Sequence, residues 1–254
     1  MTATIDFGSW LARWDRQQAG YQGDREGRFQ VMFDALEAIA GGGELTVLDL
    51  GSGPGSLAVR LLDRFPGASV IAVDVDPVLL TLGRGAYGDR YGLRFAESDL
   101  RDPAWTQRLE LDGPVDGALS TTALHWLSRD QIERLYGDLA ALLRPGGAFL
   151  DGDHRQFGQA SPRLAEAAAA MAERHRRRTA PPAAESWQDW WDAIRAEPAL
   201  AEAAAQRERL GHTHPDGRHE LRDEDQCRLL LEAGFAEAGT LWQHGDERVL
   251  AAVR

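Results

Sequence analysis

Residues 46–56, which read TVLDLGSGPGS, constrain the fold of this 254-residue chain more than any other stretch. Val47, Leu48 and Leu50 form a short apolar run that ends at a glycine-rich turn. A continuous apolar run bounded by glycines is typical of a strand buried on both faces of a parallel sheet. The glycines let a ligand approach the backbone, and a helix predicted over residues 57–65 adds its N-terminal amides. The stretch therefore predicts a strand, turn and helix that bind a nucleotide-type cofactor.

The spacing of the glycines separates the possible cofactors. A dinucleotide fingerprint has glycines at its first, third and sixth positions. Gly51 and Gly53 fit the first two positions, but Ser56 stands at the sixth, and the third glycine, Gly55, comes early. A phosphate-binding P-loop needs a lysine, and this chain has none. The turn therefore excludes a P-loop and departs from the dinucleotide pattern.

The composition narrows the class of protein further. A formal net charge of −12 argues against nucleic acid or an anionic membrane as the main partner, because both select basic surfaces. The missing lysine excludes enzymes that bind pyridoxal phosphate as a Schiff base. Cys227 is the single cysteine, so neither an intrachain disulfide nor a cysteine zinc cluster is expected. With no segment that reads as a signal peptide or membrane span, we expect a cytoplasmic protein.

The rest of the pattern alternates strands and helices, as an α/β fold requires. Further strands are predicted over residues 69–74, 93–97, 115–120, from 148 to 154, 238–243 and 247–253. Helices are predicted between them over residues 78–90, 128–143 and 222–233. A turn at residues 244–246 makes the last two strands a hairpin. The sequence therefore predicts a seven-stranded, mostly parallel sheet with an antiparallel last strand and helices on both faces.

Acidic residues follow two of these strands at informative positions. Asp74 ends the second strand about twenty residues past the glycine turn, where a carboxylate can accept both hydroxyl hydrogen bonds of a ribose. That spacing suits NAD equally well. Asp76, directly before Pro77, is the better candidate for a helix cap. Asp99 and Leu100 follow the third strand.

The pattern Asp49-x-Gly51-x-Gly53-x-Gly55, with Asp74 and Asp99 in register, resembles the motifs of class I S-adenosylmethionine (SAM)-dependent methyltransferases. The resemblance implies that SAM is the cofactor and S-adenosylhomocysteine (SAH) the product. It assigns the glycine loop to the methionine end, Asp74 to the ribose, and Asp99 with the amide of Leu100 to the adenine. The implied cofactor residues are Asp49, Gly51, Ser52, Gly53, Gly55, Asp74, Val75, Asp99, Leu100, Ser120 and Thr121.

A second resemblance concerns the acceptor. The order of a strand, Leu-His-Trp at residues 124–126, a helix, Leu-Arg-Pro-Gly-Gly at residues 143–147 and a strand is similar to small-molecule enzymes such as the trans-aconitate and malonyl-carrier-protein methyltransferases. In such enzymes the fourth strand ends beside the transferable methyl group, where Ser120 and Thr121 stand here. The resemblance therefore implies a small-molecule acceptor.

Two histidines are candidate general bases. His154 ends the fifth strand and His125 follows the fourth, and strand ends are where open α/β sheets bind ligands. A histidine can take a proton there because its ordinary pKa lies near neutral pH. The alternative for His125 is packing beside Trp126. An acceptor that is a carboxylate needs no base, and an arginine such as Arg25 or Arg28 would position it.

Two helical segments lie outside the alternating pattern. Residues 1–43 are predicted to be an N-terminal lid, with Tyr21, Arg25 and Arg28 toward the ligand. Residues 155–218 are predicted to be a helical cap inserted in the cofactor-binding core of residues 44–154 and 219–254. Trp187 and Trp191 line an acceptor pocket in this interpretation, and simple core packing is the alternative. His212, His214 and His219 lack helical ligand spacing, so no metal is expected.

The sequence thus favours methyl transfer from SAM to a small molecule. An NAD-linked oxidoreductase and a non-catalytic SAM-binding module are the alternatives, because one fold serves many functions. Abundant alanine, glycine and arginine without lysine is compatible with a GC-rich bacterial genome, and with it secondary metabolism. The sequence specifies neither the acceptor nor the oligomeric state.

Overall fold

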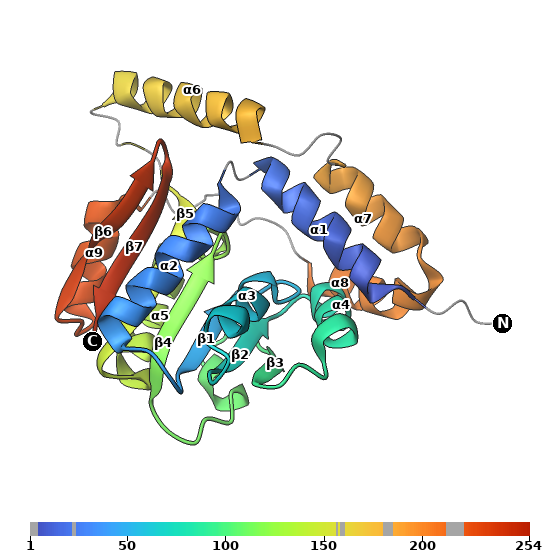
Figure 1. The fold of residues 1–254 in the computed structure, drawn as a ribbon, viewed down its shortest axis with the longest axis horizontal. Coiled ribbons are helices and arrows are strands. Elements are labelled where there is room, and N and C mark those ends of the chain that lie inside the picture. The colour runs from blue at the N-terminus through green and yellow to red at the C-terminus, as the bar shows by residue number, and fades with distance from the viewer. Residues whose placement is uncertain (1–4, 22–23, 156, 158–160, 180–184, 212–220) are drawn as a thin grey trace.

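A seven-stranded sheet forms the centre of the molecule, with strand order β3-β2-β1-β4-β5-β7-β6 (Figure 1). The computed structural model describes residues 5–21, 24–155, 157, 161–179, 185–211 and 221–254. The strands are β1 (Thr46–Leu50), β2 (Ser69–Asp74), β3 (Leu93–Glu97), β4 (Val115–Thr121), β5 (Leu143–His154), β6 (Glu237–His244) and β7 (Glu247–Val253). Strands β1 to β5 are parallel, and β7 is antiparallel to both β5 and β6. The predicted sheet with its antiparallel last strand is confirmed.

Helices cover both faces of this sheet (Figure 1). Helices α2 (Arg25–Ala40) and α3 (Ser56–Arg64) share one core with Val47, Val70 and Leu150. Helices α5 (Arg129–Leu142) and α9 (Asp223–Glu232) share the other core, which contains Leu48, Ile71 and Phe149. Neighbouring strand residues therefore alternate between the two cores, as the pleat of a strand requires.

Strand β5 begins earlier than the sequence predicts. Residues 144–147 look like a helix stop before a strand that starts at residue 148, but Leu143 already pairs with Val115 of β4. The register of this pairing shifts between Val115 and Gly117. The arginine, proline and glycines thus form an irregular segment within β5, since an extra loop of residues can be absorbed as a bulge.

Helix α4 (Pro77–Tyr87) ends sooner than the predicted residues 78–90. Gly88 caps its C-terminal end, and two further glycines lie within the helix. A Cβ on Gly83 would lie 2.6 Å from the Phe95 ring, and one on Gly85 would lie 2.5 Å from Phe7. The glycines therefore allow close packing of aromatic rings on α4. Asp76 caps the helix by accepting from the amide of Val78 at 2.9 Å, as predicted.

The helices outside the alternating pattern are α1 (Phe7–Tyr21), α6 (Pro162–Thr179), α7 (Trp187–Ala196) and α8 (Ala201–Leu210). Helix α1 contacts α4 and α7, and α8 also contacts α4, so these four helices form a third core on one side of the sheet (Figure 1). Trp190 at its centre lies 5.1 Å from the Trp14 ring and 6.0 Å from Trp10. Helix α6 lies apart from this core, beside the β6–β7 hairpin.

Three short 3₁₀ helices connect these elements: η1 (Trp105–Arg108), η2 (Leu124–Trp126) and η3 (Pro198–Leu200). None of the described helices is long and apolar enough to cross a membrane. His212, His214 and His219 lie outside the described residues. Among the residues that are described, no group of histidine, cysteine, aspartate and glutamate could hold a metal ion.

Candidate functional site

The predicted site residues lie where the parallel strands end. Leu50 at the end of β1 is in register with Val73 of β2 and with Ser120 of β4, and Ser120 is in register with Asp151 of β5. The Ser120 hydroxyl donates to the Leu50 carbonyl at 2.9 Å and so ties β4 to β1. The carboxyl ends of neighbouring parallel strands share one edge of the sheet, which is the ligand-binding edge of open α/β folds. The fold thus brings together residues that lie up to a hundred positions apart.

The glycine loop has a backbone that only glycine adopts readily. Gly51, Gly53 and Gly55 have φ angles of 66°, 56° and 88°. A Cβ on Gly51 would lie 2.3 Å from the Cβ of Ala123, so the loop also touches the segment after β4. The Ser52 amide donates to the Val73 carbonyl at 3.0 Å and holds the loop on β2. Positive φ and close approach explain why this turn requires its glycines.

Asp49 is buried beneath this loop. One oxygen, Oδ2, accepts from the amide of Ala58 in α3 at 3.1 Å, whereas the buried Oδ1 has no hydrogen-bond partner among the described residues. Burial raises the pKa of Asp49 to about 7, and the nearby Asp74 carboxylate acts in the same direction. A buried carboxylate with a spare acceptor fits a ligand that carries an ammonium or sulfonium group. The carboxylate of Asp49 is therefore suited to binding SAM.

Asp74 joins the end of β2 to the glycine loop. Its Oδ2 accepts from the Gly53 amide at 2.7 Å, and its Oδ1 accepts from the amides of Val75 and Asp76 at 2.8 Å. Burial raises the pKa of Asp74 to about 6, although these amides oppose the shift. Asp74, which is predicted to bind the ribose, thus also fixes the shape of the glycine loop.

Asp99 and Leu100 lie at the end of β3, in different surroundings. The Asp99 carboxylate accepts from the Arg101 guanidinium, with Nη2 at 2.8 Å and Nε at 2.9 Å. Leu100 is buried in the core shared with α5. Arg101 was not singled out from the sequence, because an arginine in an exposed turn gives no signal of its own.

Arg28 is the one predicted arginine that reaches the end of β4. Its Nη2 donates to the Thr121 hydroxyl at 2.9 Å, and the side chain is fully buried. A Cβ on Gly152 would lie 3.0 Å from Arg28 Cδ, so this glycine lets the arginine lie against β5. Burial lowers the pKa of Arg28, and nearby carboxylates, Glu247 and Asp153 among them, oppose this. The structure thus brings a cation to the edge predicted for the acceptor.

Arg25 and Tyr21 make other contacts. Arg25 forms an ion pair with Asp15 of α1 at 2.8 Å and lies 4.9 Å from the centre of the Phe29 ring. The Tyr21 hydroxyl accepts from the Trp187 amide at 3.1 Å, which links α1 to α7. Neither Tyr21 nor Arg25 thus shares the contact of Arg28 with Thr121.

The two candidate histidines are related to β5 in different ways. His154 belongs to the strand, whereas His125 contacts the neighbouring residue Asp153, which points to the opposite face. Asp153 and His154 alternate along the strand, and the Nδ1 atom of His125 is 2.9 Å from Asp153 Oδ2. The His154 Nδ1 atom is 3.8 Å from Asp246 Oδ2. Asp153 was missed in the sequence, although its place directly before His154 at a strand end was a signal. His125 also stacks on Trp126, as the packing alternative predicted.

Trp191 belongs to the third core, and Trp187 packs at its edge, with its ring centre 5.8 Å from that of Trp14. Trp191 is buried beneath the guanidinium of Arg207, whose carbon lies 3.7 Å from the ring centre. Arg207 also donates to Asp76 Oδ2 at 2.6 Å, so α8 is fastened near the end of β2. Trp187 is 37% exposed. Their assignment to an acceptor pocket stays a prediction.

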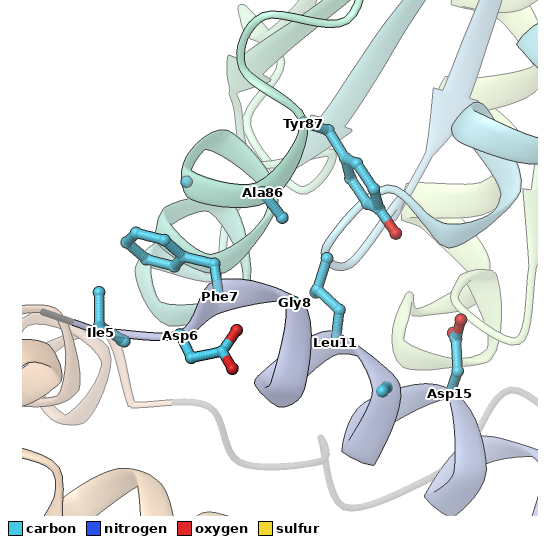
Figure 2. A pocket seen from close by; sticks show the side chains of 10 residues that line it. Ile5, Asp6, Phe7, Gly8, Leu11, Asp15, Ala86 and Tyr87 are labelled. Atoms are coloured by element: carbon cyan, nitrogen blue, oxygen red, sulfur yellow. The ribbon is translucent and has the colours of Figure 1, made fainter.

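A pocket of about 530 Å³ lies between the start of α1 and the end of α4 (Figure 2). Asp6, Asp15 and Tyr87 contribute its polar groups, and Phe7 and Leu11 are among its apolar residues. None of the predicted cofactor residues lines it. The glycine loop therefore does not line the pocket, but it is close by, because the Ser56 hydroxyl that follows the loop donates to Asp15 at 2.7 Å.

Known proteins share the central part of this chain. A family model described as a methyltransferase domain matches residues 47–147. Trans-aconitate 2-methyltransferase from Azoarcus sp. (strain BH72) is 31% identical over 154 residues, which cover 61% of this chain and 56% of that protein. Malonyl-(acyl-carrier protein) O-methyltransferase from Geobacter sulfurreducens is 31% identical over 104 residues, which cover 41% and 36%. The chain spans about half the length of the first of these relatives and less of the second.

Solved structures agree on the fold. Magnesium protoporphyrin IX methyltransferase from Synechocystis PCC 6803, solved with bound SAH, matches with a TM-score of 0.55 and 17% identity, covering all of this chain and 90% of that one. The CurJ carbon methyltransferase matches with a TM-score of 0.54 and 15% identity, covering 88% and 52%. Residues 47–147 thus match a methyltransferase domain, and the chain has the fold of solved methyltransferases.

Proposed function

We propose that this protein transfers a methyl group from SAM to a small-molecule acceptor. The buried Asp49 carries the proposal, because its spare oxygen lies beneath the glycine loop at the edge where β1, β2 and β4 end. When bound, SAM supplies an electrophilic methyl group. The relatives named above are methyltransferases, which supports the same reaction type.

We assign the cofactor residues by the chemistry of each strand end. Asp49 and the amides around the glycine loop would hold the methionine end. Asp74 would accept the ribose hydroxyls with lone pairs that its three amide contacts leave over, with Val75 beside it. Asp99 and Leu100 would hold the adenine.

On the acceptor side, the protein would bind and orient its substrate. The point of methyl transfer would be lined by Ser120 and Thr121 at the end of β4. Arg28 reaches the same point from α2. We further propose that residues 1–43 act as a lid and residues 155–218 as a cap over the core formed by residues 44–154 and 219–254. Excluding water and fixing the reactants in line would provide much of the rate acceleration.

The alternatives have less support. An NAD-linked oxidoreductase would carry a glycine at the position of Ser56, and the matched relatives are methyltransferases. A non-catalytic module would bind SAM without turnover, so an acceptor screen separates it from an enzyme. The cytoplasmic location and a role in bacterial secondary metabolism remain predictions.

Calorimetric titration of the purified chain with SAH tests the proposal. We expect binding with a micromolar dissociation constant, and at least about tenfold weaker binding by the Asp49→Asn variant, since a charged hydrogen bond contributes about 1.5 to 3 kcal/mol. Asp63→Asn is the matched control, because Asp63 pairs with Arg90 on the surface. Binding of NADH in place of SAH would refute the assignment.

A further inference from the structure

A histidine and an aspartate form a hydrogen-bonded pair beside the proposed acceptor site. His125 lies in η2 directly after β4, and its Nδ1 is 2.9 Å from Asp153 Oδ2 and 3.2 Å from Oδ1. Asp153 is 2% exposed, whereas the His125 side chain is 27% exposed. The pair thus joins a buried carboxylate to an imidazole that solvent reaches, which is the arrangement that suits proton transfer.

The backbone holds the imidazole in this place from both sides. Thr122 has a φ of 52°, which is uncommon for a β-branched residue, and its amide donates to the Gly152 carbonyl at 3.0 Å. Ala123 packs against Gly51 of the cofactor loop. Strained backbone of this kind persists where the surrounding structure holds it in place, and it clusters at functional sites. His125 is therefore tied to both the glycine loop and β5.

The carboxylate is held in its ionised form. Burial opposes ionisation, but His125 and Arg155 keep the pKa of Asp153 well below its usual range. The His154 amide also donates to Asp153 Oδ1, at 2.8 Å. An ionised carboxylate at this distance fixes the orientation of the ring and stabilises the imidazolium that forms when the ring takes a proton.

We propose that His125 is the general base of the reaction and that Asp153 is its positioning residue. The proposal rests on the proposed methyl transfer. Asp153 would accept from Nδ1–H, so that Nε2 carries the lone pair that takes the proton. As the acceptor oxygen or nitrogen bonds to the methyl carbon, the carbon–sulfur bond breaks with its electron pair left on sulfur. The acceptor proton moves to Nε2, and Asp153 stabilises the resulting imidazolium.

This assignment narrows the substrate class. A carboxylic acid is already ionised near neutral pH and has no proton to give up, so the pair would be idle with such an acceptor. A hydroxyl, phenol or amine group must lose a proton during the reaction. The His125–Asp153 pair therefore points to an acceptor with an O–H or N–H group.

Nitrogen NMR of the histidine rings tests the pair without any acceptor. In the wild-type protein we expect His125 to carry its proton on Nδ1, and the Asp153→Asn variant to lose this preference, since an amide can also donate. Asp130→Asn, an exposed change at the start of α5, is the matched control and should leave the tautomer unchanged. A wild-type ring with its proton on Nε2 would overturn the proposal.

Turnover of two acceptor sets then tests the base. We would measure SAH formation with phenols, alcohols and primary amines, and separately with carboxylic acids. With the first set we expect His125→Gln to lower kcat about 100-fold or more, and Asp153→Asn to lower it at least about tenfold with little change in KM. His244→Gln, at the sheet edge, serves as the control, and Asp153→Glu should recover part of the loss.

Unchanged SAH affinity in the His125 variant would separate this proposal from the proposed function. Failure to bind SAH in the wild-type protein would refute methyl transfer itself. Normal binding with turnover of carboxylic acids alone, or with undiminished kcat in His125→Gln, would refute the base and leave methyl transfer standing.

Discussion

Two regions at the strand ends contain buried or half-buried carboxylates, and the partners of these carboxylates differ between the regions. Beneath the glycine loop, Asp49 and Asp74 accept from backbone amides, and no ion pair between described residues involves either one. At the end of β5, Asp151 and Asp153 pair with Arg155 and His125. Burial raises the pKa of Asp49 to about 7 and that of Asp151 to about 6, whereas His125 and Arg155 lower the pKa of Asp153. Among the described residues, only the second region contains cations that pair with its carboxylates.

The difference separates carboxylates that can bind a ligand from carboxylates that stabilise the fold. A buried carboxylate without a counter-ion lowers the stability of the fold and favours binding of a cationic ligand. A carboxylate that is paired inside the protein needs its partner in order to stay buried. Removing one charge should therefore change the free energy of unfolding in opposite directions in the two regions.

Removing the shared cation at the end of β5 should have the largest effect. Arg155 forms ion pairs with Asp151 and with Asp223, and all three residues are buried. We expect Arg155→Met to lower the free energy of unfolding by about 3 to 5 kcal/mol, because the buried Asp151 loses its ion-pair partner, whereas Asp223 keeps Arg248. Urea denaturation of this variant measures the loss.

A surface pair provides the control for this comparison. Arg177 pairs with Glu173 on α6 and its side chain is 76% exposed. Arg177→Met should change the stability by only about 0.3 to 0.5 kcal/mol. Equal losses in the two variants would contradict a special role for the buried pairs.

Neutralising Asp49 should have the opposite sign. Its pKa rises from 3.8 to about 7 on folding, so the folded protein holds the proton more tightly and loses stability as pH rises through that window. The ionised form then costs up to roughly 4 kcal/mol at pH 8, at 1.36 kcal/mol per pKa unit. Asp49→Asn should therefore be more stable than wild type at pH 8, and the difference should vanish near pH 4.

Thermal denaturation across this pH range measures the effect in the absence of ligand. The same variant should bind SAH more weakly, so stability and binding change in opposite directions. A variant that is less stable at pH 8 and binds SAH normally would place Asp49 with the supporting carboxylates instead.

A change in loop shape should have a smaller effect. Gly51 has a positive φ, and a new Cβ would contact Ala123. We expect Gly51→Ala to lower the free energy of unfolding by about 1 to 3 kcal/mol and to weaken SAH binding. Gly113→Ala, where nothing lies within 4 Å of a new Cβ, is the control measured in the same denaturation series.

Most of the sheet could be predicted because its strands carry local signals. The strands at Ser69–Asp74 and Leu93–Glu97 have the limits that the sequence predicts, since each apolar run is bounded by a turn and an acidic residue. The start of β5 could not be predicted, because it depends on pairing with β4. The end of α4 was also missed, because the helix ends at Tyr87, where Gly88 caps it, and does not continue to residue 90.

The residues of the candidate site differ in the same way, because some carry a local signal in the sequence and others depend on tertiary contacts. Asp49, Asp74 and Asp99 could be singled out because a motif fixes their spacing from the glycine loop, and Arg28 because it lies in the segment predicted to be a lid. The sequence could not tell which histidine meets Asp153, because that depends on which face of β5 each side chain takes. Arg101 and Arg207 gave no signal, since their partners lie in turns and on other helices.

The interlocking of α1 with α7 limits how this chain can be recombined with its relatives. Arg13 of α1 donates to both oxygens of Glu185, and Trp14 and Trp10 pack on Trp190. The first helix and the inserted helices thus form one module, although about 170 positions separate them in the chain. A chimera that takes its insertion from another methyltransferase needs the matching first helix as well.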